Sequence, residues 1–371
     1  MTKKKIATRY SELDLVAQLS EKKHFMLITF QLTRRCNNNC RHCNVNLAAD
    51  DAASAKNELS TSRIKELIDQ AVAAGVLFGC FTGGEPLLRH DFKELYLYLK
   101  DKGVLPIILT NATLIEESHI ELFKKYPPRN IEITVYGATR ETYERVTRVA
   151  GSFERFRRGV DLLLRNRIKI ELKGMILASN FHELPKIREF CIENSRPDPF
   201  RAEPFVYLRL DGDTKKNAWI KKERLKVSEI VDWELRYHPD CVQWIKENYC
   251  GETLSSRSAN NRFFPCAIDK YDCTIADDGA FLFCPMLRHP DYSFSLEKMT
   301  IKEAFEALGR KIRSLNPPQG VLLEKCGNCK VKQFCLRCPG RCYAETGKPD
   351  RPSEYLCDIA FGRAKAYGYK L

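Results

Sequence analysis

Between residues 24 and 210, short apolar strand patterns alternate with amphipathic helix patterns, with six of each. The predicted strands are 24–32, 76–81, 104–110, 131–136, 169–177 and 204–210. The predicted helices are 63–74, 91–101, 114–124, 139–146, 153–165 and 181–194, and Ser60 or Thr61 caps the first of them. Strands that alternate with helices of this length predict an α/β fold with a parallel sheet, helices outside it, and ligands bound at the carboxyl ends of the strands. Periodicity alone leaves open whether this sheet closes.

Three cysteines follow the first predicted strand directly. Cys36, Cys40 and Cys43 are spaced C-x3-C-x2-C, and no fourth cysteine lies nearby in the sequence. A structural zinc site needs four protein ligands, whereas three thiolates can hold a cubane iron-sulfur cluster and leave one iron open. A zinc loop is the alternative interpretation, because C-x2-C pairs are common zinc ligands.

The second motif is Thr82-Gly83-Gly84-Glu85-Pro86, which follows the second predicted strand. Glycines allow the backbone to approach a ligand closely, and a carboxylate at a strand end can accept hydrogen bonds from an ammonium group. The alternative is an ordinary strand-to-loop turn in which Pro86 prevents the ladder from continuing.

The two motifs together resemble those of the radical S-adenosylmethionine (SAM) superfamily. The resemblance implies an open, partial six-stranded (β/α)6 barrel, and a [4Fe–4S] cluster held by Cys36, Cys40 and Cys43. In that family the open iron chelates the amino and carboxylate groups of SAM, and one electron from the cluster yields a 5′-deoxyadenosyl radical. A flavodoxin- or ferredoxin-type protein is the expected electron donor.

The resemblance also implies residues that contact SAM. We expect Glu85 at the methionine amino group, His42 beside the adenine, and polar contacts from Asn111 and Thr134, which follow or end predicted strands. The expected SAM-binding set is His42, Gly83, Gly84, Glu85, Asn111 and Thr134. Taken singly, Asn111 suits a turn and Thr134 suits strand propensity.

The C-terminal cysteines resemble the SPASM domain, which holds auxiliary iron-sulfur clusters in radical SAM enzymes. Asp278-Gly279 predicts a tight β-hairpin turn just before Cys284. The resemblance implies one cluster at Cys326, Cys329, Cys335 and Cys357, and another at Cys266, Cys284 and Cys338, completed by Cys342 or Cys273. The usual spacing is C-x2-C-x5-C-x3-C, but here Cys335 is followed by Cys338 after two residues and by Cys342 after six, so this ligand is ambiguous. A pair of structural zinc sites is the alternative.

Length and composition agree with two domains. The chain has 371 residues and is 44% apolar. We predict an N-terminal extension (1–23), the barrel (24–210), a helical linker (211–265) and the SPASM domain (266–371). Sixteen cysteines without a visible signal peptide or membrane-length apolar run indicate a reduced, cytoplasmic protein with no membrane partner. Cys80, Cys191 and Cys241 are expected to be small core residues.

A formal net charge of +13 makes a zinc-containing nucleic-acid-binding protein the rival from another class. No aromatic-basic RNA-binding motif accompanies the basic runs, so nucleic acid is not the expected partner.

The substrate prediction rests on the resemblance alone. SPASM-containing radical SAM enzymes often modify peptides, and segments 283–285, 337–340 and 343–347 look like the peptide-maturase branch. The predicted function is an oxidoreductase-type enzyme that abstracts hydrogen from a peptide or protein to cross-link, oxidise or epimerise it. The alternative is dehydrogenation, decarboxylation or rearrangement of a small molecule. The residues before the first strand are too few for a leader-binding domain, so a leader is expected to bind the barrel, the linker or a separate protein.

Overall fold

The computed structural model describes residues 25–195, 200–238, 240, 263–264, 272–315, 322–336 and 338–370. The predicted extension 1–23, much of the predicted linker, Cys241 and Cys266 lie outside the described residues.

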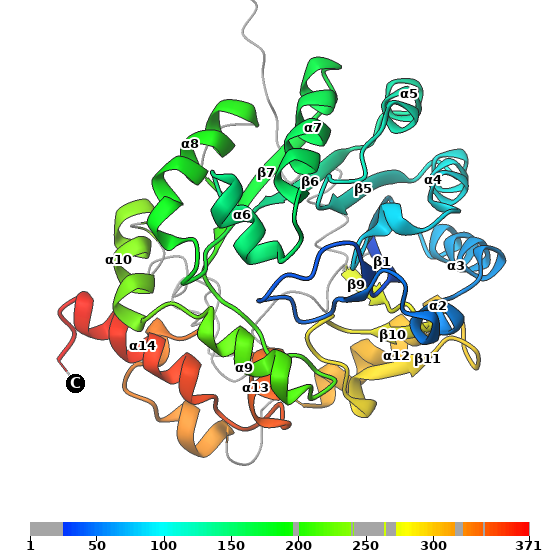
Figure 1. The fold of residues 1–371 in the computed structure, drawn as a ribbon. Coiled ribbons are helices and arrows are strands. Elements are labelled where there is room, and N and C mark those ends of the chain that lie inside the picture. Colours follow the sequence, from blue (N-terminus) through cyan, green and yellow to red (C-terminus); the bar gives the residue numbers. More distant parts are fainter. Residues whose placement is uncertain are drawn as a thin grey trace, which may run out of the picture.

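Six parallel strands form the centre of the fold, in the order in which they occur in the chain. They are β1 (Leu27–Thr33), β4 (Phe78–Gly83), β5 (Leu105–Thr110), β6 (Asn130–Val135), β7 (Ile170–Met175) and β8 (Ala202–Glu203). Helices α3 (Thr61–Ala73), α4 (Phe92–Asp101), α5 (Glu117–Lys125), α6 (Arg140–Thr147), α7 (Ser152–Arg165) and α8 (Leu184–Asn194) connect successive strands. They surround the curved sheet on its outside (Figure 1). This confirms the predicted six-stranded α/β class, and Ser60 caps α3 as expected, by accepting from the Arg63 N–H.

The sixth strand is shorter than predicted, and it lies just before the predicted range 204–210, where the prediction was wrong. Only Ala202 and Glu203 pair with β7, and the segment from Pro204 to Leu208 adds no ladder. Pro204 has no N–H to donate, which opposes strand continuation at that point. The apolar residues that suggested a strand, Phe205 and Val206 among them, are buried without strand pairing.

The predicted hairpin near Gly279 is present, but it also extends the barrel sheet. β9 (Asp272–Ile275) pairs antiparallel with β10 (Ala280–Leu282), which pairs with β11 (Ser293–Ser295). Gly279 has φ 85°, as a tight turn requires. On its other side, β9 pairs in parallel with β1, from Leu27–Asp272 to Phe30–Ile275. Over the described residues the sheet therefore has nine strands, and part of the cysteine-rich region shares it with the barrel.

The remaining elements complete the C-terminal side and the loop after β1. They are β2 (Arg35–Cys36), β3 (Leu47–Ala48), α2 (Ala52–Asn57), α9 (Thr214–Lys222), α10 (Val227–Tyr237), α12 (Ile301–Ser314), α13 (Pro339–Thr346) and α14 (Glu354–Ala366), with short turns η2 (Pro86–Leu88), η3 (Phe181–Glu183), η7 (Pro290–Tyr292), η8 (Leu322–Gly327) and η9 (Lys332–Phe334). None of the described helices is both long enough and apolar enough to cross a membrane.

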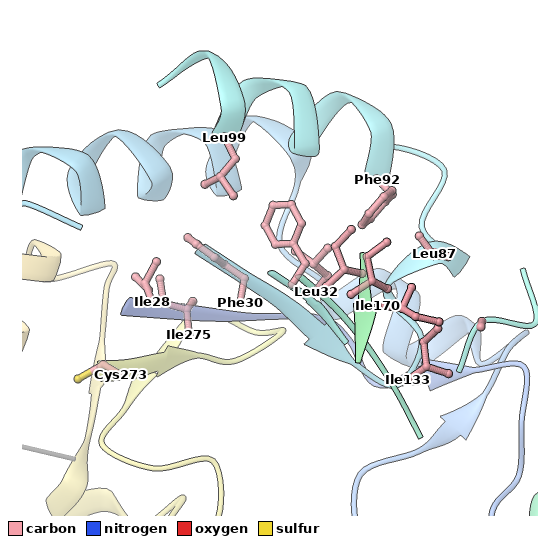
Figure 2. Close-up of a cluster of buried hydrophobic side chains, with 14 of the residues drawn as sticks. Ile28, Phe30, Leu32, Leu87, Phe92, Leu99, Ile133, Ile170, Cys273 and Ile275 are labelled. Carbon is pink, nitrogen blue, oxygen red and sulfur yellow. The ribbon is translucent and has the colours of Figure 1, made fainter. Parts of the chain in front are cut away.

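The main core lies between the sheet and the helices outside it, and β1 contributes one part of it. Ile28, Phe30 and Leu32 alternate with less buried residues and point toward α3 and α4, where they meet Phe92 and Leu99 (Figure 2). Each such fully buried side chain contributes roughly 1.5–3 kcal/mol to stability. This packing fixes β1, and with it the position of the cysteine loop that follows.

Candidate active site

The cysteine loop, residues 34–46, begins where β1 ends. Burial, helped by the charges of Glu85 and Cys43, raises the pKa of Cys36 to about 12. Burial likewise raises the pKa of Cys40 well above its usual value, with further contributions from Cys43 and Cys36. The three thiols are therefore near enough to oppose one another's ionisation. Without metal, Cys36 and Cys40 hold their protons, and metal binding must displace them.

Backbone contacts to α6 hold this loop. The N–H groups of Asn39 and Arg41 donate to the carbonyls of Thr147 and Val146, at 2.9 and 3.1 Å. Carbonyls in the last turn of a helix have no partner within the helix, so the loop satisfies groups that α6 would otherwise leave open.

Glu85 joins the ends of β4 and β5. Its side chain is fully buried, and it accepts from the Leu87 N–H at 3.1 Å, the Thr110 hydroxyl at 2.8 Å and the Asn111 N–H at 2.8 Å. Burial raises its pKa to about 7, although the three donors favour the charged form. Glu85 lies close enough to Cys36 to affect its pKa, so the structure brings the two sequence motifs together.

Gly83 and Gly84 are required by protein packing at this point. A Cβ on Gly83 would lie 2.1 Å from the Thr33 carbonyl oxygen, and one on Gly84 would lie 2.2 Å from that of Arg35. The Gly84 N–H donates to Thr33 O at 2.7 Å, and the Glu85 N–H donates to Arg35 O at 2.9 Å. The glycines thus let the segment after β4 bind residues 33 and 35, where the cysteine loop begins. The sequence had suggested that they make room for a ligand instead.

Asn111 faces the cysteine loop. Its side-chain amide donates to Asn37 Oδ1 at 2.9 Å and approaches Cys36 Sγ at 3.7 Å, while its oxygen accepts from Thr113. The Asn38 N–H also donates to Cys36 Sγ, at 3.4 Å. Hydrogen bonds to this sulfur favour its thiolate form.

The imidazole ring of His42, within the cysteine loop, lies next to the ring of Tyr136. Their ring centroids are 5.2 Å apart, and the Tyr136 hydroxyl hydrogen-bonds Cys40. Burial lowers the pKa of His42 to about 4, so its imidazole is neutral at ordinary pH. Thr134, two residues before Tyr136, lies on the same face of β6.

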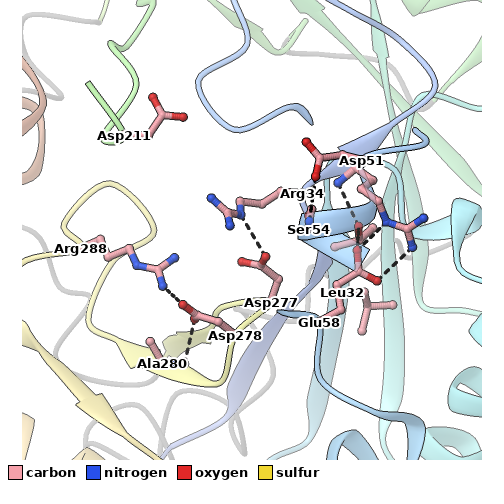
Figure 3. Close-up of polar contacts among 12 residues, drawn as sticks. Leu32, Arg34, Asp51, Ser54, Glu58, Asp211, Asp277, Asp278, Ala280 and Arg288 are labelled. Atoms are coloured by element: carbon pink, nitrogen blue, oxygen red, sulfur yellow. Dashed lines mark hydrogen bonds and ion pairs between the residues drawn. The ribbon is translucent and has the colours of Figure 1, made fainter. Parts of the chain in front are cut away.

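Glu58, which no sequence motif marked, organises the other side of the loop. Its carboxylate accepts two hydrogen bonds from the Arg35 guanidinium, at 2.7 and 3.0 Å. It also accepts from the Thr33 hydroxyl, and from Arg89 at 3.4 Å. Nearby, Arg34 donates to Asp277 in the β9–β10 turn at 2.9 Å (Figure 3). No local pattern could have identified these partners, because they come together only in the fold.

These residues fit a metal cluster and its cofactor. Three mutually interacting thiols meet at one strand end, and the buried Nδ1 of His42 has no hydrogen-bond partner within the described ranges. Among the described residues, no three His, Cys, Asp or Glu side chains converge on a single-ion position. The fit therefore rests on the thiol group and the buried imidazole.

The C-terminal cysteines form a second group. Burial raises the pKa of Cys335 and of Cys357. Neighbouring thiols add to both shifts: Cys357, Cys326 and Cys342 act on Cys335, and Cys329 acts on Cys357.

Cys342 links this group to Cys338. Cys338 is the largest charge contribution to the raised pKa of Cys342, whereas the pKa of Cys273 is raised by burial and Asp272 and by no thiol. Cys273 lies in the main core, and Cys284 packs against that core, half-buried. Cys80 and Cys191 are buried, as expected.

Comparisons with known proteins identify the barrel. Residues 30–191 match the sequence model of the Radical SAM superfamily. The chain contains a radical SAM domain. This confirms the predicted SAM and [4Fe–4S] cluster as its cofactors, because the domain uses both.

Similar proteins differ in what their names describe. An AdoMet-dependent heme synthase of Methanosarcina barkeri is 25% identical over 86% of this chain and 93% of its own length. The PqqA peptide cyclase of Granulibacter bethesdensis is 28% identical over 43% of this chain and 42% of its own. The structure of Streptococcus suis SuiB bound to the precursor peptide SuiA has a TM-score of 0.66 at 16% identity, and the match covers 96% of this chain and 84% of that one.

Proposed function

We propose that Cys36, Cys40 and Cys43 hold the [4Fe–4S] cluster, and that the enzyme abstracts hydrogen from a carbon of a peptide or protein substrate. The observation that carries this proposal is the meeting of the three thiols with Glu85 and Asn111 at the carboxyl ends of β1, β4 and β5. When bound, the cluster and SAM supply the 5′-deoxyadenosyl radical that abstracts the hydrogen atom.

The chain's own residues prepare the thiolates and the cofactor pocket. The Asn111 amide and the Asn38 N–H stabilise the Cys36 thiolate, and the Tyr136 hydroxyl stabilises that of Cys40. Neutral His42 offers a flat apolar face and a free nitrogen to the adenine. Glu85 keeps the two strand ends together, and its carboxylate suits the methionine ammonium. Thr134 and the glycines remain proposed cofactor neighbours.

Two auxiliary clusters are proposed in the C-terminal region. Cys326, Cys329, Cys335 and Cys357 form the first ligand set, which their mutual effects on pKa support. The second set contains Cys266, Cys284 and Cys338, with Cys342 preferred to Cys273 because Cys342 is the one that faces Cys338. Residues 266–371 would then be the SPASM domain.

A peptide substrate is supported by the peptide cyclase similarity and by the match to SuiB with its bound precursor peptide. A flavodoxin- or ferredoxin-type donor, a cytoplasmic location and a separate leader-binding protein belong to the same proposal. The second candidate is a small carboxylate-bearing molecule such as a tetrapyrrole. It is favoured by the heme synthase, which matches most of this chain.

The first test concerns SAM cleavage. Anaerobic reconstitution with iron and sulfide, followed by dithionite and SAM, should yield 5′-deoxyadenosine and methionine. Replacing Cys36, Cys40 and Cys43 with alanine should abolish both products. Cys191→Ala is the matched control, because Cys191 is buried in the core away from the loop. Formation of 5′-deoxyadenosine by the triple variant would show that these cysteines are not the ligands of the cluster that cleaves SAM.

The second test chooses the substrate class. Peptides encoded beside the gene, deuterated at the reacting carbon, should transfer deuterium to 5′-deoxyadenosine and lose two hydrogens if they are oxidised or cross-linked. Deuterium transfer without a mass change would indicate epimerisation. Turnover of iron-coproporphyrin with loss of carbon dioxide, and no reaction with any peptide, would replace the peptide proposal with the small-molecule one.

A further inference from the structure

Arg209 is a buried arginine that reaches the cysteine loop from the far edge of the parallel sheet. It lies in the segment after β8, its side chain is 1% exposed, and Asp211 accepts from its Nε at 3.0 Å. Its Nη1 donates to the carbonyl of Asn46 at 3.1 Å, to Asn46 Oδ1 at 3.3 Å and to the carbonyl of Cys43 at 3.4 Å. Lys216 of α9 adds a second donor to the Asn46 carbonyl, at 3.1 Å.

This contact crosses the mouth of the barrel. β8 is the last strand on one side, and four strands separate it from β1, which leads into the cysteine loop. The guanidinium of Arg209 therefore makes its hydrogen bonds to Asp211 and to the cysteine loop, and it is not available to bind a substrate or cofactor carboxylate. Because a buried guanidinium keeps its charge, breaking these bonds would leave an unpaired charge, and this holds the segment in place.

Arg363 makes the same arrangement at the second cysteine group. Its side chain is 1% exposed, and it pairs with Glu234 of α10, which is 2% exposed. Its Nη1 donates to the Phe334 carbonyl at 3.0 Å, directly before Cys335. Arg209 comes from outside the cysteine loop, and Arg363 comes from α14, which also carries Cys357. Each arginine pairs with a carboxylate and donates to a main-chain carbonyl at or next to a cysteine.

We propose that Arg209 and Arg363 are positioning residues for the radical cluster and the auxiliary cluster, respectively. This inference rests on the proposed cysteine ligands. Side chains that orient metal ligands control metal affinity and redox behaviour without touching the metal. Arg209 would fix the end of the cysteine loop so that Cys43 keeps its place relative to Cys36 and Cys40. Arg363 would do the same for Cys335.

The test compares Arg209→Met with Arg363→Met in the full chain, each serving as the other's matched control. In metal-free protein, hydrogen exchange at residues 39–47 should become severalfold faster in Arg209→Met and stay unchanged in Arg363→Met. Exchange at residues 330–342 should show the reverse. After reconstitution, Arg209→Met should lose much of the SAM-induced change in the electron paramagnetic resonance (EPR) spectrum. Arg363→Met should keep that change and show an altered auxiliary signal.

Arg209→Lys should recover part of the SAM response, because it keeps the charge and one donor. If Arg209→Met does not fold, Arg209→Lys alone tests whether Arg209 positions the cysteine loop. Equal exchange in the loop and an unaltered SAM response in both Arg209 variants would overturn the inference. If instead the triple cysteine variant keeps the wild-type iron content and SAM response, the proposed function itself fails, and the two failures are distinguishable.

Discussion

Replacing Gly84 with alanine should displace the cysteine loop. The new Cβ would lie 2.2 Å from the Arg35 carbonyl oxygen and 2.5 Å from that of Arg34. Ordinary carbon contacts need about 3.5 Å, so one backbone segment must move by more than about 1 Å. That movement breaks the bonds from the Gly84 N–H to Thr33 O and from the Glu85 N–H to Arg35 O.

The magnitude follows from the two backbone N–H groups, of Gly84 and Glu85, that lose their acceptors. Each such group costs roughly 1–3 kcal/mol when it is left unsatisfied in a buried site, which gives about 2–6 kcal/mol of lost stability. Urea unfolding of the metal-free protein measures this loss. Iron content and the SAM-induced change in the EPR spectrum measure its effect on the loop, and both should fall.

Gly103→Ala separates this clash from ordinary glycine strain. Gly103 has φ 78°, and nothing lies within 4 Å of its Cβ position, so alanine there meets backbone strain but no neighbour. We expect a loss of roughly 1–2 kcal/mol and full iron binding. The reasoning is refuted if Gly84→Ala unfolds like Gly103→Ala and binds as much iron.

Three further predictions concern individual side chains. Burial raises the pKa of Glu85 to about 7, so between about pH 4.5 and 7 the folded protein keeps a proton that the unfolded chain has lost. The metal-free protein should therefore lose up to about 3 kcal/mol of stability as the pH rises from about 4.5 to about 7, and Glu85→Gln should flatten that dependence in urea titrations. Asn111→Leu removes the amide beside Cys36 Sγ and should lower the reduction potential of the radical cluster in an EPR-monitored titration, whereas an unchanged potential would remove Asn111 from this role. Cys342→Ser should lower auxiliary iron content and Cys273→Ser should not, and the opposite result would reverse the ligand preference.

The sequence predicted the features whose causes are local. Strand and helix periodicity placed the six parallel strands within a few residues, and Ser60 marked the start of α3, because side-chain alternation and capping act over short distances. The exception is residues 204–210, where apolar composition suggested a strand, although Pro204 opposes one.

Contacts between distant segments left no readable pattern. Nothing near Asp272 indicates that β9 pairs with β1, because strand pairing depends on which edge remains open after the barrel forms. For the same reason the sequence did not mark Glu58, nor did it indicate that the guanidinium of Arg209 binds Asn46. The two glycines were recognised correctly as necessary, but the reason for them is a neighbouring backbone.

The β1–β9 pairing determines how the two proposed cluster regions are related. β1 leads directly to Cys36, and β9 leads through the hairpin and β10 to Cys284. The hairpin turn also binds the loop, since Asp277 accepts from Arg34 through its side chain and from the Leu59 N–H through its carbonyl. Adjacent hydrogen-bonded strands cannot change their separation without breaking the ladder. If Cys284 is an auxiliary ligand, its distance from the radical cluster is therefore set by the sheet, and a substrate between them meets both sites in one fixed geometry.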